Sequence, residues 1–94
     1  MQVIATKITQ NPAIVKFELD EIIVRTENFE FKNIDETQNS PLAKQLFFLP
    51  FVKTVYVSGN FIAIEKFSIV EWEDVQEDVA NQINEFISNG GEII

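Results

Sequence analysis

The chain has 94 residues, a net charge of −8, and neither cysteine nor histidine. This length fits one domain with one modest hydrophobic core. The negative charge argues against nucleic-acid and anionic-membrane partners, which are bound by clustered Lys and Arg, and any charged partner is expected to be basic. The missing residue types exclude disulfides, thiol nucleophiles and imidazole bases or ligands.

The N-terminus predicts no targeting or membrane segment. No apolar run reaches the ~18–20 residues of a membrane span. Residues 1–10 lack the long apolar core of a signal peptide. The sequence therefore predicts a cytoplasmic protein.

The first half of the chain predicts a hairpin followed by one or two short strands. Residues 3–9 and 13–19 are rich in β-branched side chains, and Asn11-Pro12 between them is a turn signal. Residues 22–31 contain a β-branched run and then an alternation that places Phe29 and Phe31 on one face. The polar stretch 33–39 predicts a mobile loop.

A short helix opens the second half. Ser40 is a typical helix cap, and Pro41 fits the first helical position. Pro50 limits the helix because the residue before a proline disfavours the α region. Ser40 has no histidine base anywhere in the chain, so capping explains it better than a nucleophilic role.

A hairpin and a longer helix complete the chain. Residues 52–66 predict two strands that turn at Ser58-Gly59-Asn60. Phe61 is expected in the core, and on that premise Phe61→Ala costs about 3–5 kcal/mol. Apolar residues at steps of three or four predict a helix over residues 72–88.

The element order is β-β-(β)-α-β-β-α, which indicates a small α+β fold. The simplest arrangement is an antiparallel or mixed sheet with both helices on one face. The domain is expected to cover residues 1–90. Residues 92–94 have nothing obvious to pack on, and residues 91–94 are predicted to begin a linker to a missing C-terminal region.

Acidic residues gather at the start of the last helix. They offer oxygen ligands for a hard cation, or paired carboxylates for acid–base work. A metal-binding or regulatory module is therefore the alternative function. A solvated helix start is favoured, because the helix dipole prefers negative charge there and no loop gathers the carboxylates. The acidic residues are Glu71, Glu73, Asp74, Glu77 and Asp78.

The segment around the first turn is a candidate for partner binding. Asn11 and Pro12, with Lys16 and Phe17 beside them, could hold a partner's carboxylate or backbone, although a plain hairpin turn is the favoured interpretation. Trp72 is interpreted as a core residue rather than an interface anchor.

Residues 47–51 read FFLPF and include four large apolar side chains. These cannot all face inward from a short helix and its exit, so one or two should reach the surface. Phe48 and Phe51 are therefore candidates for a partner contact. Burial of the segment under the loop 33–39 is an equal alternative.

Two motifs resemble a known family. Residues 9–17 read TQNPAIVKF and are similar to the T-x-N-P-N-x-x-K-F opening of the N-terminal domain of Nfu/NifU-type iron–sulfur scaffold proteins. The segment from Ser40 to Lys66 resembles that domain's S-P-L-A-x-x-L-F … P-x-V-x-x-V … F-I-x-x-x-K pattern. Trp72 matches as well, whereas Ala13 stands where the family usually has a second Asn.

The resemblance implies a non-catalytic, accessory role in iron–sulfur cluster assembly or delivery. In that family a C-x-x-C pair in a separate C-terminal domain holds the cluster. No cofactor is therefore expected in this cysteine-free chain. Its expected partners are client apoproteins, assembly factors or its own C-terminal domain, with Asn11, Pro12, Lys16 and Phe17 as interaction candidates.

Overall fold

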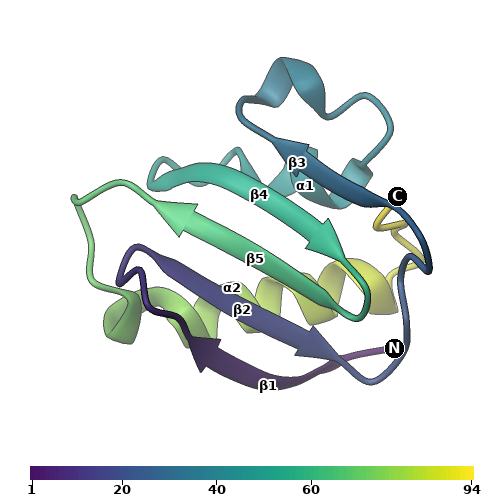
Figure 1. The fold of residues 1–94 in the computed structure, drawn as a ribbon, viewed down its shortest axis with the longest axis horizontal. Coiled ribbons are helices and arrows are strands. Elements are labelled where there is room, and N and C mark those ends of the chain that lie inside the picture. Colours follow the sequence, from purple (N-terminus) through teal and green to yellow (C-terminus); the bar gives the residue numbers. More distant parts are fainter.

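A five-stranded antiparallel sheet forms one layer of the molecule, and two helices form the other (Figure 1). The computed structural model describes all residues, 1–94. The strand order is β1-β2-β5-β4-β3, and every neighbouring pair is antiparallel. The elements are β1 (Val3–Ile8), β2 (Ile14–Leu19), β3 (Asn28–Phe31), the 3₁₀ helix η1 (Ile34–Glu36), α1 (Pro41–Leu46), β4 (Val52–Ser58), β5 (Phe61–Lys66) and α2 (Trp72–Ser88).

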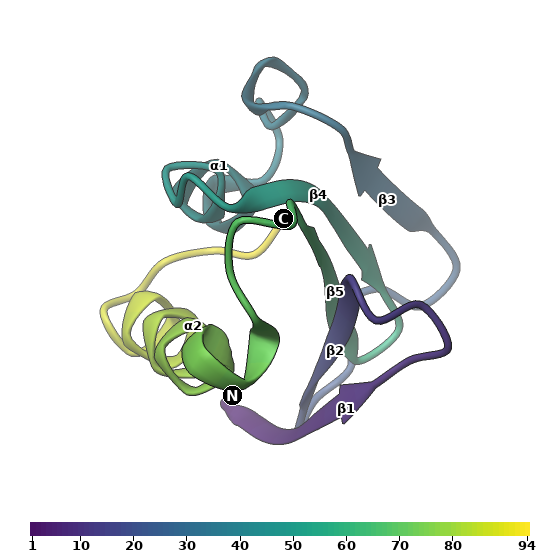
Figure 2. The ribbon, with the colours of Figure 1, turned by 90° about the vertical axis from the view of Figure 1, so that its left-hand side faces the viewer.

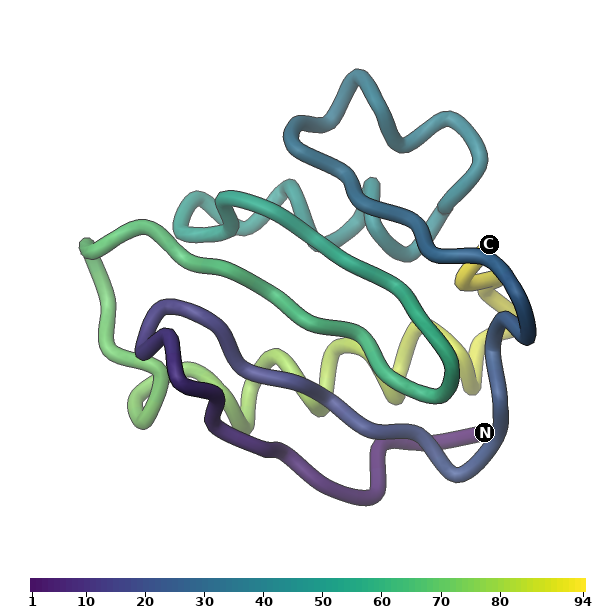
Figure 3. Tube along the Cα trace, viewed as in Figure 1, coloured from purple at the N-terminus to yellow at the C-terminus, as the bar shows by residue number.

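Both helices cover the same face of the sheet, and the opposite face carries none (Figure 2). The predicted α+β fold is confirmed, with an antiparallel rather than mixed sheet. The chain trace shows the two hairpins, β1–β2 and β4–β5, lying side by side through β2 and β5 (Figure 3). The second hairpin turns at Gly59-Asn60, where Gly59 has φ +53. The first position of a tight type II′ turn requires such a positive φ.

The hydrophobic core lies between the sheet and the helices. Each fully buried aliphatic or aromatic side chain contributes about 1.5–3 kcal/mol relative to exposure. The core side chains with 1% exposure or less are Val15, Phe17, Leu19, Leu42, Ala43, Leu46, Val55, Val57, Ile62, Ile64, Val79 and Ile83. They come from β2, β4, β5 and both helices, so the core requires the two hairpins and the two helices together.

The C-terminal residues pack against the start of α1. Ser40 Oγ accepts a bond from Ala43 N at 3.1 Å, which confirms the predicted cap, and donates to the carbonyl oxygen of Ile93 at 2.5 Å. Leu42 N donates to the carbonyl oxygen of Glu92, and Ile93 is buried. The prediction that residues 92–94 have nothing to pack on is wrong, because Glu92 and Ile93 contact the start of α1, about 50 residues earlier in the sequence.

Residues 22–39 contain one strand and a short 3₁₀ helix. Of the one or two strands predicted within residues 22–31, one forms, which is β3. Residues 22–25 form no second strand, because Ile23 N and Val24 N both donate to the carbonyl oxygen of Gly59 and the chain wraps around the β4–β5 turn. The polar stretch predicted as a loop contains η1, capped by Asn33. Its Thr37 is buried, with its hydroxyl donating to the carbonyl oxygen of Ile34.

Phe61 lies on the uncovered face of the sheet, not in the core. The β2–β5 register pairs Phe17 with Ile62, so Phe61 points the other way beside Glu18. Its ring lies 6.1 Å from that of Tyr56, and the Lys16 ammonium sits 4.6 Å from its centroid. Phe61 is half-buried, so the premise behind a cost of about 3–5 kcal/mol for its removal fails.

Candidate interaction surface

Three connections meet at one end of the molecule, which we call the turn end. They are the β1–β2 turn (residues 9–13), the α1–β4 connection (residues 47–51) and the β5–α2 connection (residues 67–71). All three lie at the left of Figure 1, whereas both chain termini lie at the right. The turn end therefore brings together the two segments that sequence analysis selected separately, and adds a third.

Backbone hydrogen bonds join the three connections. Phe67 N donates to the carbonyl oxygen of Phe51 at 2.8 Å, and Lys66 N donates to the carbonyl oxygen of Ala13 at 3.0 Å. Trp72 Nε1 donates to the same Ala13 oxygen at 2.7 Å. The turn end is therefore a hydrogen-bonded unit rather than three independent loops.

Trp72 packs beneath this end, in the core. Its ring meets those of Phe17 and Phe51 edge-on, with centroids 5.9 and 6.3 Å away. Such edge-to-face pairs add about 0.5–1.5 kcal/mol beyond area burial. The predicted core role of Trp72 is confirmed by its 6% exposure.

The Asn-Pro turn is built from its own side chains. Asn11 Oδ1 accepts from Ala13 N at 2.9 Å, and Asn11 N donates to Thr9 Oγ1 at 3.2 Å. Ile14 N donates to the carbonyl oxygen of Asn11. Asn commonly forms such local turns. The bonds at Ala13 use only its backbone, so they do not depend on a second Asn there.

Lys16 and Phe17 lie on opposite faces of β2. Phe17 has 0% exposure in the core, whereas Lys16 stacks over Phe61 on the uncovered face. Phe17 is thus corrected from an interaction candidate to a core residue, since a partner cannot reach it on the folded domain. Asn11 and Pro12 are exposed at the turn end.

Two of the three connections at the turn end carry exposed apolar side chains. Phe48 is 63% exposed, which confirms that residues 47–51 send an apolar side chain to the surface, whereas Phe51 is only 9% exposed. Phe51 is therefore corrected to a buried residue, one that packs on Trp72. Phe67 and Ile69, which no sequence pattern had indicated as candidates, are 46% and 67% exposed. Their position in a connection just after a strand was the available signal.

The carboxylates at the start of α2 are solvent-exposed along the helix surface. No group of three His, Cys, Asp or Glu side chains is arranged to hold a metal ion. The structure therefore offers nothing that favours the alternative of an acidic metal-binding module.

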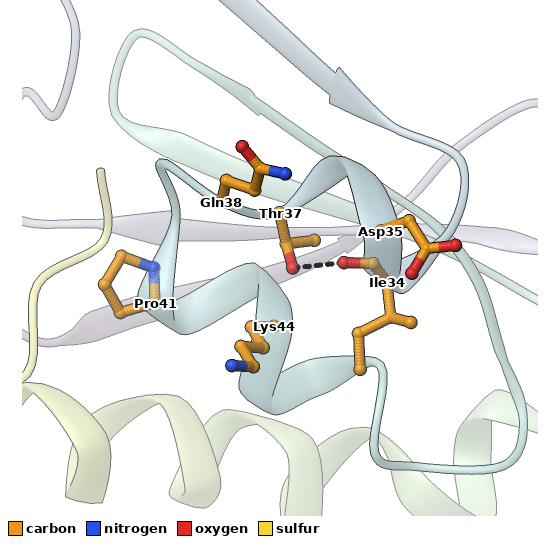
Figure 4. Close-up of a pocket in the computed structure, with 6 residues that line it drawn as sticks. All are labelled: Ile34, Asp35, Thr37, Gln38, Pro41 and Lys44. Carbon is orange, nitrogen blue, oxygen red and sulfur yellow. Dashed lines mark hydrogen bonds between the residues drawn. The ribbon is translucent and has the colours of Figure 1, made fainter.

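A hollow of about 550 Å³ lies between η1 and α1 (Figure 4). Asp35 and Lys44 point in different directions there, and the drawn hydrogen bond is the one from Thr37 Oγ1 to the carbonyl oxygen of Ile34. Its lining holds no nucleophile beside a base, so the hollow offers no arrangement for covalent catalysis. The turn end remains the stronger candidate for function.

The chain matches the model of a known protein family. The model of the family described as "Scaffold protein Nfu/NifU N terminal" matches residues 4–90. The chain belongs to this family. The match spans both motifs on which the resemblance rested, from the Asn-Pro turn through α2.

Curated relatives come from several eukaryotes. The chain is 31% identical over 88 residues to the human mitochondrial NFU1 iron–sulfur cluster scaffold homologue, covering 93% of the chain and 35% of that protein. It is 32% identical to the Drosophila willistoni counterpart, covering 93% of the chain and 30% of that protein. The Arabidopsis thaliana mitochondrial NifU-like protein 5 is 28% identical, and the match covers 93% of this chain and 32% of that protein. The chain thus spans about a third of these relatives' length.

Solved structures share the fold. The NifU-like protein from Saccharomyces cerevisiae superposes with a TM-score of 0.81 at 24% identity, covering 99% of this chain and 85% of that one. A Staphylococcus aureus protein superposes with a TM-score of 0.75 at 22% identity, covering 88% of this chain and 99% of that one. At these identities the likeness concerns the fold.

The predicted cytoplasmic location is contradicted. The Arabidopsis, Drosophila and human relatives are mitochondrial proteins by name. The prediction rested on the missing signal-peptide core, and such an absence does not define a compartment. Neither helix is long and apolar enough to cross a membrane.

Proposed function

We propose that this chain is a non-catalytic, protein-binding domain of an iron–sulfur cluster scaffold, and that it contacts client apoproteins or assembly factors through the turn end. The observation that carries the proposal is that two hydrogen-bonded connections leave three apolar side chains exposed there, Phe48, Phe67 and Ile69. Asn11 and Pro12 flank it, and Lys16 remains a separate candidate on the uncovered sheet face.

The residue content supports an accessory role. Iron–sulfur clusters are held mainly by cysteine thiolates, with histidine in some centres. The chain has neither residue, so it offers no usual ligand to a cluster. The cluster is therefore cargo for another part of such a scaffold. Curated relatives extend well beyond the matched region, which leaves room for that part.

The structure of the turn end supports a binding role. Its three connections are joined by backbone hydrogen bonds and rest on Trp72, so the exposed side chains project from an ordered base. Pre-ordered surfaces lose less conformational entropy on binding. Exposed aromatic residues on such a base are typical binding hot spots.

Resonance mapping tests the proposal. The isotope-labelled chain is titrated with an apo iron–sulfur protein, and separately with the cysteine-bearing remainder of a full-length relative. We expect saturable shifts at Phe48, Phe67 and Ile69. Resonances at Ile22, an exposed apolar residue beside the chain termini, serve as the internal control.

Shifts at Ile22 equal to those at Phe48 would indicate nonspecific apolar contact. The absence of saturable shifts with every client and with the cysteine-bearing remainder would contradict the proposed function.

A further inference from the structure

One edge of the sheet is open for strand pairing. β1 pairs only with β2, and alternate backbone groups of an edge strand point away from the sheet. Val3 N is occupied by Asn84 Oδ1 at 2.7 Å, and a register shift between Val3 and Ala5 marks a bulge. The backbone of residues 5–8 makes no hydrogen bond outside the β1–β2 pairing. We call residues 5–8 the open edge.

Ile8, in this open edge, is the most exposed large apolar side chain of the protein, at 84%. It pairs with Val15, whose side chain is buried on the helix-covered face, so Ile8 points to that face too. A strand added beside residues 5–8 would cover Ile8 and satisfy the free backbone groups.

An acidic row of α2 lies alongside the open edge. Asn84 contacts Val3, and steps of three or four residues continue its helix face through Asn81 to Glu77 and Glu73. α2 runs antiparallel to β1 (Figure 1). The five residue steps from Val3 to Ile8 span about 16 Å, which equals the rise of about eleven helical residues. Ile8 therefore lies near Glu73, and both acidic side chains are exposed.

We propose that the open edge takes an extended basic segment of a partner protein as a sixth strand. An apolar residue of that segment covers Ile8, and its Lys or Arg side chains reach Glu73 and Glu77. α2 contains no basic residue that would oppose them. The assignment of the open edge rests on the proposed function, because both require the domain to bind proteins. It adds a second binding surface and names the chemistry of the partner.

Charge selects this occupant over a second copy of the chain. Two copies would each bring a net charge of −8 to the contact, and like charges disfavour the pairing. A basic segment gains from the same field, which speeds association at low salt. Affinity for the open edge should therefore fall as ionic strength rises.

A synthetic probe tests the assignment. The labelled chain is titrated with a short blocked peptide of alternating lysine and valine, and with a glutamate–valine peptide as its match. We expect saturable binding of the basic peptide only, with slowed amide exchange at alternate residues within 5–8. Ile8→Ser, which removes the apolar contact without adding charge, and separately the double variant Glu73→Lys/Glu77→Lys, should each weaken binding about tenfold, a change that equals about 1.4 kcal/mol.

Matched variants lie away from the open edge. Ile22→Ser and the double variant Glu27→Lys/Glu30→Lys change exposed residues of the same types, and should leave peptide affinity within about twofold. Equal binding of the acidic peptide, unprotected amides at 5–8, or no saturation would overturn the assignment. A client that shifts Phe48 but leaves 5–8 unprotected would contradict this inference while supporting the proposed function.

Discussion

Residues 9–17 and residues 47–51 were both candidates for partner binding, yet the structure uses them differently. In the first segment, Asn11 forms the turn and Phe17 fills the core. In the second, Phe51 is buried against Trp72, whereas Phe48 is 63% exposed. One segment is mostly committed to folding, and the other retains an apolar side chain that no internal contact accounts for.

The difference shows that residues of the family motifs can be fully explained by the fold. Asn11 and Phe17 are explained by a hydrogen bond and a packed ring, while Phe67 and Ile69 lie outside both quoted motifs and are exposed. The proposed binding surface is built from side chains that the core does not require. Stability and binding should therefore separate along this division.

The largest expected effect is at Phe17. Phe17→Ala removes a ring with 0% exposure that packs on Trp72, and should lower the free energy of unfolding by about 3–5 kcal/mol. Urea denaturation followed by Trp72 fluorescence measures it. Ile8→Ala, at an exposed site, is the control. A loss below about 1 kcal/mol would remove Phe17 from the core.

A smaller effect is expected at Asn11. Asn11→Ala removes the acceptor of the Ala13 amide in the β1–β2 turn, and should cost about 0.5–1.5 kcal/mol, a typical net value for one hydrogen bond. The same denaturation experiment measures it, with exposed Gln10→Ala as the matched control. Equal stability of the two variants would show that the turn does not depend on this side chain.

The smallest effect on stability is expected at Phe48. Phe48→Asp replaces an exposed ring, so the free energy of unfolding should stay within about 0.5 kcal/mol of the parent. A loss above about 2 kcal/mol would place Phe48 among the structural residues. The contrast between the two segments would then disappear.

Much of the fold could be predicted because its signals are local. Ser40-Pro41 correctly indicated the start of α1, and the 3.6-residue apolar period correctly indicated α2. The Gly59-Asn60 turn correctly indicated the second hairpin. The errors were tertiary. Phe61 and Ile62 are adjacent and both apolar, so the sequence does not show which of them faces the core. The pairing of Ile62 with Phe17 between β5 and β2 places Ile62 there.

The candidate site was predicted in part for the same reason. Crowding among residues 47–51 correctly indicated an exposed apolar side chain, but could not say that Phe51 turns inward against Trp72. Phe67 and Ile69 join Phe48 only because a hydrogen bond from Phe67 to Phe51 brings their connections together. That bond links residues 16 positions apart, so local sequence patterns could not predict it.

The most direct test compares client affinity of Phe48→Asp with that of Ile22→Asp, which changes an exposed apolar residue beside the chain termini. Isothermal titration of each folded variant with the apo iron–sulfur client that shifts the turn end gives both constants. We expect about tenfold weaker binding for Phe48→Asp, as for an aromatic hot spot, and no change for Ile22→Asp. Unchanged affinity for Phe48→Asp, or an equal loss in both variants, would contradict binding through the turn end.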